Sequence, residues 1–344
     1  MKKYFLMAVC IITMSMTASA ITINKALLEH NGEVTLFDGN NIQDAINASV
    51  DGDIIYLTLG TFKPFNVTKK ITIRGTGETS IINGDVTIEI PNSPTLTSPV
   101  LEALKVTGSV TLGSAVSNLL FRQCWFTSSC KLEGNVNGGT IEKCKIGNLS
   151  FTHPIQDLTI DRCYITGSLT LSSQIQSMTV LNSKLYDVAA NTGATNNTTF
   201  VNCNFYILHT PSFSGTIINS IINYSQNNYG SSPISSTVIL NSLMYGYSSC
   251  VSIYSSSVAQ NCYYYNNYLS IFIDSNTCNC GLDTSTLKSY GYLGTDGTVV
   301  GIYGGETPYD DNMLVPSVPK VTSSDIKLDT EKKELNVKLT VSPQ

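Results

Sequence analysis

A six-residue pattern recurs along the middle of this 344-residue chain and restricts what the chain can fold into. Each copy begins with an apolar residue, ends with an apolar or aromatic one, and has Cys or Ser in fourth place. The Cys or Ser residues stand at 124, 144, 163, 183, 203, 220, 242 and 262, so the copies repeat every 17 to 22 residues. Repetition at this period is typical of a solenoid, in which each copy is one unit stacked on the next.

The residues of the repeat predict strands. Val, Ile, Phe and Thr dominate each copy, and a second short alternating run, such as residues 168–171, follows it. Charged residues make up only 13% of the chain, whereas helices normally carry Lys and Glu on their wet faces. Coils of this length with three short strands each form an all-β fold, a single-stranded right-handed parallel β-helix of about ten coils.

The residue before the Cys or Ser is expected to form a left-handed bend, because Asn often stands there and tolerates that conformation. These residues are Asn182, Asn202, Asn219, Asn241 and Asn261. A small side chain then fits inside the bend, which predicts a buried column of free thiols. Its members are Cys124, Cys144, Cys163, Cys203 and Cys262. The state of Cys130, Cys250, Cys278 and Cys280 is left open.

Both ends of a solenoid need covers, because stacked strands leave unpaired edges. At the N-terminal end, Asn41 is placed to cap a short helix over residues 42–48, whose apolar face holds Ile42, Ala45 and Ile46. At the C-terminal end, residues 326–328 and 335–341 alternate and flank a charged turn, which predicts a β-hairpin.

An outward-facing column of the late coils is apolar. Its members are Leu181, Val201, Ile218 and Leu240. A contiguous exposed apolar stripe usually has a cover, and the C-terminal hairpin has a matching apolar edge. We therefore expect the hairpin to fold back over this stripe, or the stripe to meet a second chain.

Residues 1–20 are typical of a secretory signal peptide. Lys2 and Lys3 precede an apolar run, and Ala18-Ser19-Ala20 is a cleavage signal, so cleavage is expected after Ala20. The run is too short to span a membrane. We predict a secreted protein (periplasmic, cell-surface or extracellular) with the β-helix and its cap in residues 21–300 and the tail with its hairpin in residues 301–344.

Part of the sequence resembles a known superfamily. Residues 41–48, Gly52-Asp53 with the following strand, and Gly60-Thr-Phe62 look like the opening of pectin-lyase-like right-handed β-helix proteins. Residues 71–75 and 81–84 are similar to the next coil of that superfamily. Residues 296–319 and the hairpin resemble a tail of secreted bacterial β-helix proteins of unassigned activity. The resemblance implies the fold, and many relatives cleave acidic polysaccharides.

The chemistry of those relatives is not evident in this chain. The sequence has no calcium-binding aspartate cluster with a nearby arginine, and it predicts neither a metal site nor a cofactor. Glu142 and Asp161 fall in one outward column on neighbouring coils, near the separation of a retaining glycosidase. Arg122 occupies the same column one coil earlier. The alternative interpretation is a structural charge ladder on a solvated face.

Aromatic and lysine residues suggest a binding face. Aromatic rings stand just after the Cys or Ser, where they alternate with lysine, and again two residues further on. Such a strip suits sugar rings and hydroxyls. The candidate residues are Trp125, Lys145, Tyr164, Lys184, Tyr186 and Tyr206. The alternative is that Tyr simply fits pleated surfaces.

The leading hypothesis is therefore a β-helix protein that binds polysaccharide without catalysis. The alternatives are a polysaccharide lyase or glycoside hydrolase with an atypical site, and a structural or adhesin-like rod that binds a protein. The net charge of -5 argues against nucleic acid as a partner.

Overall fold

The computed structural model describes residues 24–190, 197–209, 215–223, 237–245, 258–265, 284–315, 320–329 and 334–342. The expected signal peptide lies outside the described residues, as do Cys250, Cys278 and Cys280. Among the described residues, no helix has the length and apolar character that crossing a membrane requires.

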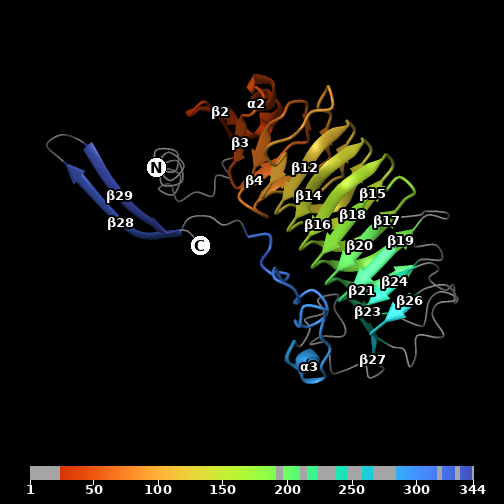
Figure 1. The fold of residues 1–344 in the computed structure, drawn as a ribbon. Helices are drawn as coiled ribbons and strands as arrows, with labels where there is room; N and C mark the ends of the chain where they lie inside the picture. The colour runs from red at the N-terminus through yellow and green to blue at the C-terminus, as the bar shows by residue number, and fades with distance from the viewer. Residues whose placement is uncertain are drawn as a thin grey trace.

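The chain forms a right-handed parallel β-helix, which confirms the expected fold. Two long sheets run side by side along its axis (Figure 1). Sheet A contains β1 (Lys25–His30), β2 (Glu33–Asp38), β3 (Ile54–Leu57), β6 (Thr72–Arg74), β9 (Leu101–Glu102), β12 (Val116–Arg122), β14 (Val136–Glu142), β16 (Ile155–Asp161), β18 (Met178–Leu181), β20 (Thr198–Val201), β22 (Gly215–Ile218), β24 (Val238–Leu240) and β26 (Val258–Gln260). All pair in parallel except β1, which is antiparallel to β2 and β3.

Sheet B carries the other half of each coil. It contains β4 (Gly60–Phe62), β5 (Phe65–Val67), β7 (Ser80–Ile82), β8 (Val86–Ile88), β10 (Lys105–Val106), β11 (Val110–Leu112), β13 (Trp125–Leu132), β15 (Lys145–Phe151), β17 (Tyr164–Leu171), β19 (Lys184–Ala190), β21 (Asn204–His209), β23 (Ile221–Asn223), β25 (Leu243–Tyr245) and β27 (Tyr263–Tyr265). Inward side chains of both sheets make one continuous apolar core.

The number of coils differs from the expected ten. The solenoid has about eight turns, which match the eight copies of the repeat from β12 to β27. Three short strands per coil occur only before β12. From β13 onward one long strand replaces the second and third strands of the coil. Strand β13 pairs with both β10 and β11. Its pairing with β15 shifts register between Phe126 and Ser129.

The left-handed bend between sheet A and sheet B is present in every regular turn, as the Asn residues predicted. The residue before each Cys or Ser has a φ between 42° and 53°. Asn holds this position in the later turns, whereas Gln123, Lys143 and Arg162 hold it in the earlier ones. The bend therefore requires a positive φ at this residue, whereas the outward side chain can vary.

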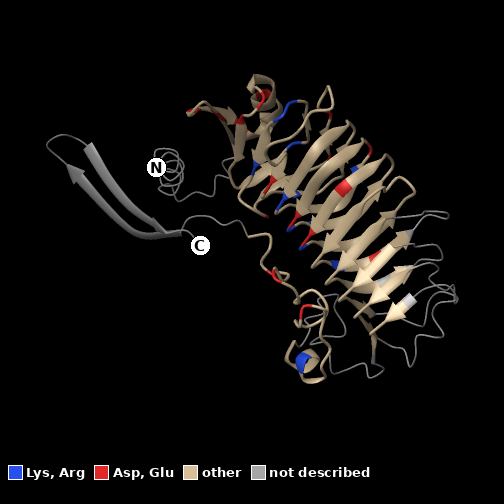
Figure 2. Cartoon of the chain, in the orientation of Figure 1, with Lys and Arg blue, Asp and Glu red and all other residues tan. Residues whose placement is uncertain are grey.

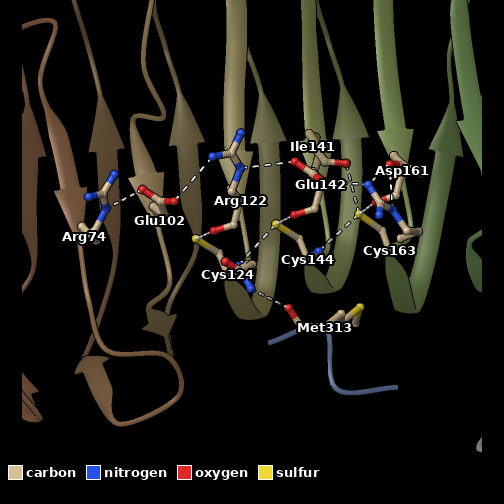
Figure 3. Close-up of polar contacts among 12 residues, drawn as sticks. Arg74, Glu102, Arg122, Cys124, Ile141, Glu142, Cys144, Asp161, Cys163 and Met313 are labelled. Atoms are coloured by element: carbon tan, nitrogen blue, oxygen red, sulfur yellow. Dashed lines mark hydrogen bonds and ion pairs between the residues drawn. The ribbon is translucent and has the colours of Figure 1, made fainter. Parts of the chain in front are cut away.

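The Cys or Ser inside each bend does more than fit a small space. Its backbone N–H donates to the sulfur or oxygen of the next turn, with distances of 3.4 Å from Cys124 to Cys144 and 3.0 Å from Cys163 to Ser183. Its own S–H or O–H donates to the carbonyl two residues back, as from Ser183 to Leu181 at 2.7 Å. Figure 3 shows the first part of this column. A Cys or Ser satisfies both needs, and Ala would satisfy neither.

The cysteines of this column are free, as expected. Cys124, Cys144, Cys163 and Cys203 are buried, and Cys262 is half-buried. Cys130, which the repeat left unexplained, is also free and buried, and it lies in β13. Burial raises the pKa of Cys130 and Cys203 to about 12, and raises those of Cys144 and Cys163 well above the ordinary value.

The N-terminal cap combines the expected helix with an unexpected hairpin. Helix α2 (Ile42–Ala48) buries the three apolar residues named for it, but the Asn41 side chain makes no capping hydrogen bond. The one-turn helix η1 (Gly39–Asn41) precedes α2, and Asp38 accepts the N–H of Asn40 there. Strands β1 and β2 cover the first edge of sheet A by pairing antiparallel to β3, a role the sequence analysis missed.

The C-terminal part divides into two pieces. Residues 284–315, here called the strap, begin with helix α3 (Thr284–Ser289) and run along the solenoid toward its early turns (Figure 1). Strands β28 (Lys320–Asp329) and β29 (Glu334–Ser342) form the expected hairpin. Within the described residues the hairpin pairs with no solenoid strand, so the expected fold-back of the hairpin is not observed. The strap lies against the solenoid instead.

The raised thiol pKa values predict inert cysteines. At pH 8 about one in ten thousand molecules would carry the Cys203 thiolate, and only the thiolate attacks a disulfide reagent. Reagent labelling with peptide mapping should therefore modify Cys130, Cys144, Cys163 and Cys203 only after denaturation, without reductant. Rapid labelling of the native protein, or a disulfide at any of these positions, would contradict the buried column.

The hydrogen bonds of Ser183 predict a sharp contrast between two substitutions. Ser183→Ala should lower the free energy of unfolding by about 1–3 kcal/mol, because the buried N–H of Cys163 and carbonyl of Leu181 lose a partner. Ser183→Cys should change it much less, since Cys holds the equivalent place in other turns. Urea unfolding measures both; equal losses would show that the hydrogen bonds contribute little.

Candidate functional site

A column of lysine and aromatic residues runs along the outer face of sheet B, at the first position after the bend. The strand register aligns Lys105, Trp125, Lys145, Tyr164 and Lys184 on successive turns. The Nζ of Lys105 lies 3.8 Å from the centre of the Trp125 ring, and the Nζ of Lys145 lies 4.2 Å from it. The column is therefore a ladder of cation–π contacts.

The lysine contacts determine which groups of this column are accessible to a ligand. Lys105 and Lys145 come from the turns before and after Trp125, so the two ammonium groups approach the ring from opposite neighbours along the axis. The column therefore presents lysine N–H donors and the half-exposed indole of Trp125. The open ring faces that the sequence analysis pictured are occupied by lysine.

The strap covers the second half of this column. Lys184 is buried, its Nζ lies 2.8 Å from an oxygen of Asp311, and it lies 4.4 Å from the centre of the Tyr309 ring. Tyr164 packs against the apolar cluster of the strap. In the next turn the column holds Asn204, whose side-chain oxygen accepts the N–H of Ile302. The column then becomes apolar, with Ile221 and Leu243 buried in one cluster with strap residues.

Asparagine side chains of the bends anchor the strap. The Asn182 amide donates to the carbonyls of Ile302 and Gly304 at 3.1 and 2.7 Å. The Asn219 side chain accepts the N–H of Thr295 at 3.0 Å and donates to its hydroxyl. At these two bends the Asn side chain therefore bonds to the strap.

The strap ends at the early turns, where Gln123 donates to the carbonyls of Met313 and Val315 at 3.3 and 2.9 Å. Residues after 315 up to 319 lie outside the described part of the chain. Lys105, Trp125 and Lys145 are half-exposed. We call these three residues the open strip.

Nearby charges, hydrogen bonds and burial shift the pKa values of the strap residues around Lys184. Burial raises the pKa of Asp311, but the hydrogen bonds from Lys184 and Tyr303 and the charge of Lys184 outweigh it, so the pKa lies below its usual value. Burial, and next the nearby Asp311, raise the pKa values of Tyr303 and Tyr309. Lys184 and Asp311 thus form a charged pair at neutral pH.

Tyr186 and Tyr206 belong to the neighbouring outward column. Their rings stack with centres 5.1 Å apart and planes 16° from parallel. Each is half-exposed. The structure therefore splits the six predicted binding residues into three groups: Trp125 and Lys145 in the open strip, Tyr164 and Lys184 at the strap, and the stacked tyrosine pair.

Glu142 and Asp161 do lie on adjacent strands of sheet A, in register with Arg74, Glu102 and Arg122. Acidic and basic residues on this sheet gather on its early strands (Figure 2). Arg122 lies 3.2 Å from Glu142, while Arg162 lies 2.8 Å from Glu142 and 2.6 Å from Asp161 (Figure 3). Both carboxylates are thus held by guanidinium groups.

This ladder extends the one that the sequence suggested. Glu102 joins Arg74 at 2.6 Å and Arg122 at 3.6 Å, and the Arg74 guanidinium lies over the Tyr56 ring. The alternation of sign along one column explains why the charges stay partly buried. Within the described residues, no group of three His, Cys, Asp or Glu side chains is placed to hold a metal ion.

Sequence reasoning missed Lys105, Tyr309 and Asp311. Lys105 stands one repeat before Trp125, so extending the repeat toward the N-terminus would have found it. Tyr309 and Asp311 lie in an aperiodic segment. Only the folded chain brings them to Lys184.

The Lys184–Asp311 pair predicts a pH-dependent contribution to stability. A carboxylate with a lowered pKa stabilises the fold above its unfolded pKa and stops doing so as pH falls through the folded value. Asp311→Asn should therefore lower the free energy of unfolding at pH 7 by at most ~1 kcal/mol, because Asp311 is well exposed. The difference should disappear as the pH falls through the lowered pKa of Asp311. Glu306→Gln, an exposed change in the same strap, is the control and should have no such pH dependence; an equal effect there would refute this role.

Comparisons with known proteins identify no relative: no family model, curated protein or solved structure matches the chain. The structure by itself shows the architecture, a parallel β-helix.

Proposed function

We propose that this protein binds polysaccharide along the outer face of sheet B, at the open strip of Lys105, Trp125 and Lys145. We further propose that it acts outside the cell, following the signal-like residues 1–20, and that it is a distant pectin-lyase-like β-helix protein. The last two proposals rest on the sequence features described above.

One observation carries the binding proposal. The open strip presents two half-exposed ammonium groups, two turns apart, that have no carboxylate partner among the described residues. Two turns correspond to about 9.6 Å along the axis at ~4.8 Å per turn. The indole between them holds both side chains in place, so less rotamer freedom is lost on binding.

In the same column, one lysine is already bound by acceptor groups of the protein itself. Lys184 is engaged by an acceptor oxygen of Asp311 and by the Tyr309 ring, both from the strap. Lys145 and Lys105 occupy equivalent places in the register, without such a partner. Oxygen acceptors of a sugar chain lying along the axis would fill the role that the strap fills at Lys184.

The proposal does not assign catalysis to Glu142 and Asp161. A general acid must hold a proton at working pH and a base must be free to take one. Arg122 and Arg162 donate to Glu142, and Arg162 donates to Asp161, so both carboxylates are already engaged as hydrogen-bond acceptors. The structure supports the alternative interpretation of this column, a structural ladder.

Affinity electrophoresis against a panel of neutral and acidic polysaccharides tests the proposal. Replacing Lys105 and Lys145 together by Ala should weaken binding about 30-fold, if each charged hydrogen bond contributes about 1 kcal/mol at this exposed site. Trp125→Ala should weaken binding similarly, because both lysines lose the ring that positions them. Lys63→Ala, an exposed lysine near the N-terminal cap, is the matched control.

Two results would count against the proposal. One is wild-type protein that binds no polysaccharide of the panel. The other is binding that survives both the double lysine variant and Trp125→Ala. Release of reducing ends or unsaturated products by the wild-type protein would favour the enzyme alternative.

A further inference from the structure

The late strands of sheet A present an uncharged outer face. Strands β18, β20, β22 and β24 contain no Lys, Arg, Asp or Glu, and Figure 2 shows no blue or red on them. Two outward columns lie in register across these strands. One consists of Leu181, Val201, Ile218 and Leu240, and the other of Thr179, Thr199, Thr216 and Val238. We call this surface the late face.

The apolar column of the late face is half-buried rather than buried. The strap contacts the Asn bends and the first column of sheet B, on the far side of the bend. In the early turns the same column carries the arginine and carboxylate ladder. A column that changes from charged to apolar along a solenoid, with its apolar part still accessible, indicates a protein contact.

The hairpin offers a surface of the same kind. Its register pairs Ile326 with Val337 and Leu328 with Leu335. These are the residues that the alternating sequence assigns to one apolar face. An isolated two-stranded hairpin is only marginally stable in water, so this face needs a partner. Within the described residues β28 and β29 pair only with each other.

The two surfaces match in length. Leu181 to Leu240 spans three turns, about 14 Å at ~4.8 Å per turn, and Leu335 to Leu339 spans four residues, about 14 Å at ~3.4 Å per residue. The other positions of the hairpin are polar or charged, with Asp325 opposite Lys338. A hairpin laid along the axis would thus cover the apolar column and leave its charged positions in water.

We propose that the hairpin of one molecule docks on the late face of a second copy of this chain. The hairpin backbone lies apart from β18, β20 and β24 of its own solenoid (Figure 1), so it does not cover the late face of its own chain. Each chain supplies one donor and one acceptor, and a reciprocal exchange closes into a two-fold dimer. This assembly lies on sheet A and is independent of the open strip on sheet B.

Light scattering after size exclusion, over a range of protein concentrations, tests the proposal. The wild-type protein should be a dimer. A late-face variant, Val201→Arg with Ile218→Glu, and a hairpin variant, Ile326→Lys with Val337→Glu, should each be monomeric. Arg122 and Glu142 occupy the same column on neighbouring early turns, so the column accepts an oppositely charged pair without unfolding. Thr170→Glu, outward on sheet B, is the control and should stay dimeric.

Mixing the two variants separates this proposal from a general loss of folding. The late-face variant keeps a native hairpin and the hairpin variant keeps a native late face, so the mixture should regain a heterodimer joined by one docking site. A monomeric wild-type protein, dimers that persist in both variants, or a mixture that stays monomeric would overturn the proposal. A hairpin that covers its own solenoid would give the first of these results, a monomeric wild-type protein.

Discussion

The left-handed bend between the two sheets is the constraint on which the rest of the structure depends. Each turn must reverse direction between an outward residue of sheet A and an outward residue of sheet B, and a positive φ accomplishes this in a single residue. The Cys or Ser that follows points inward and ties its turn to the next by a hydrogen bond. A side chain without an acceptor would leave the backbone N–H of the preceding turn without this partner.

Stacking turns in exact register has a second consequence, because every outward residue then lies beside its counterpart one turn away. Like charges in such a column would repel. Arg74, Glu102, Arg122 and Glu142 therefore alternate in sign, and Arg162 binds both neighbouring carboxylates, Glu142 and Asp161. Lysines likewise alternate with rings, as around Trp125. The outer surface is therefore made of ladders, and a break in a ladder indicates another contact. The buried Lys184 under Asp311 is one such break.

The strap contacts both the bends and an outward column of the solenoid. Its anchors are the amides of Asn182 and Asn219, residues that the bend requires only for their backbone conformation. The same residues thus serve the local turn and a contact more than 70 positions away in the sequence. The strap also limits the proposed binding face to the early turns, because it occupies the later part of the lysine and aromatic column.

The sequence by itself determined the solenoid, its bends and its thiol column, because these follow from a local pattern repeated at a fixed spacing. It also placed Glu142 and Asp161 in one column, since the register follows the repeat. It overestimated the number of turns, because the irregular coils before β12 resemble regular ones in composition.

Only the tertiary structure decided which parts of each column are open. The strap has no repeat, so nothing in its sequence says that Asp311 meets Lys184 or that Met313 reaches Gln123. The same holds for the N-terminal hairpin that covers β3. Contacts between a periodic body and an aperiodic segment depend on the path of the chain in space, and a one-dimensional pattern does not contain that path.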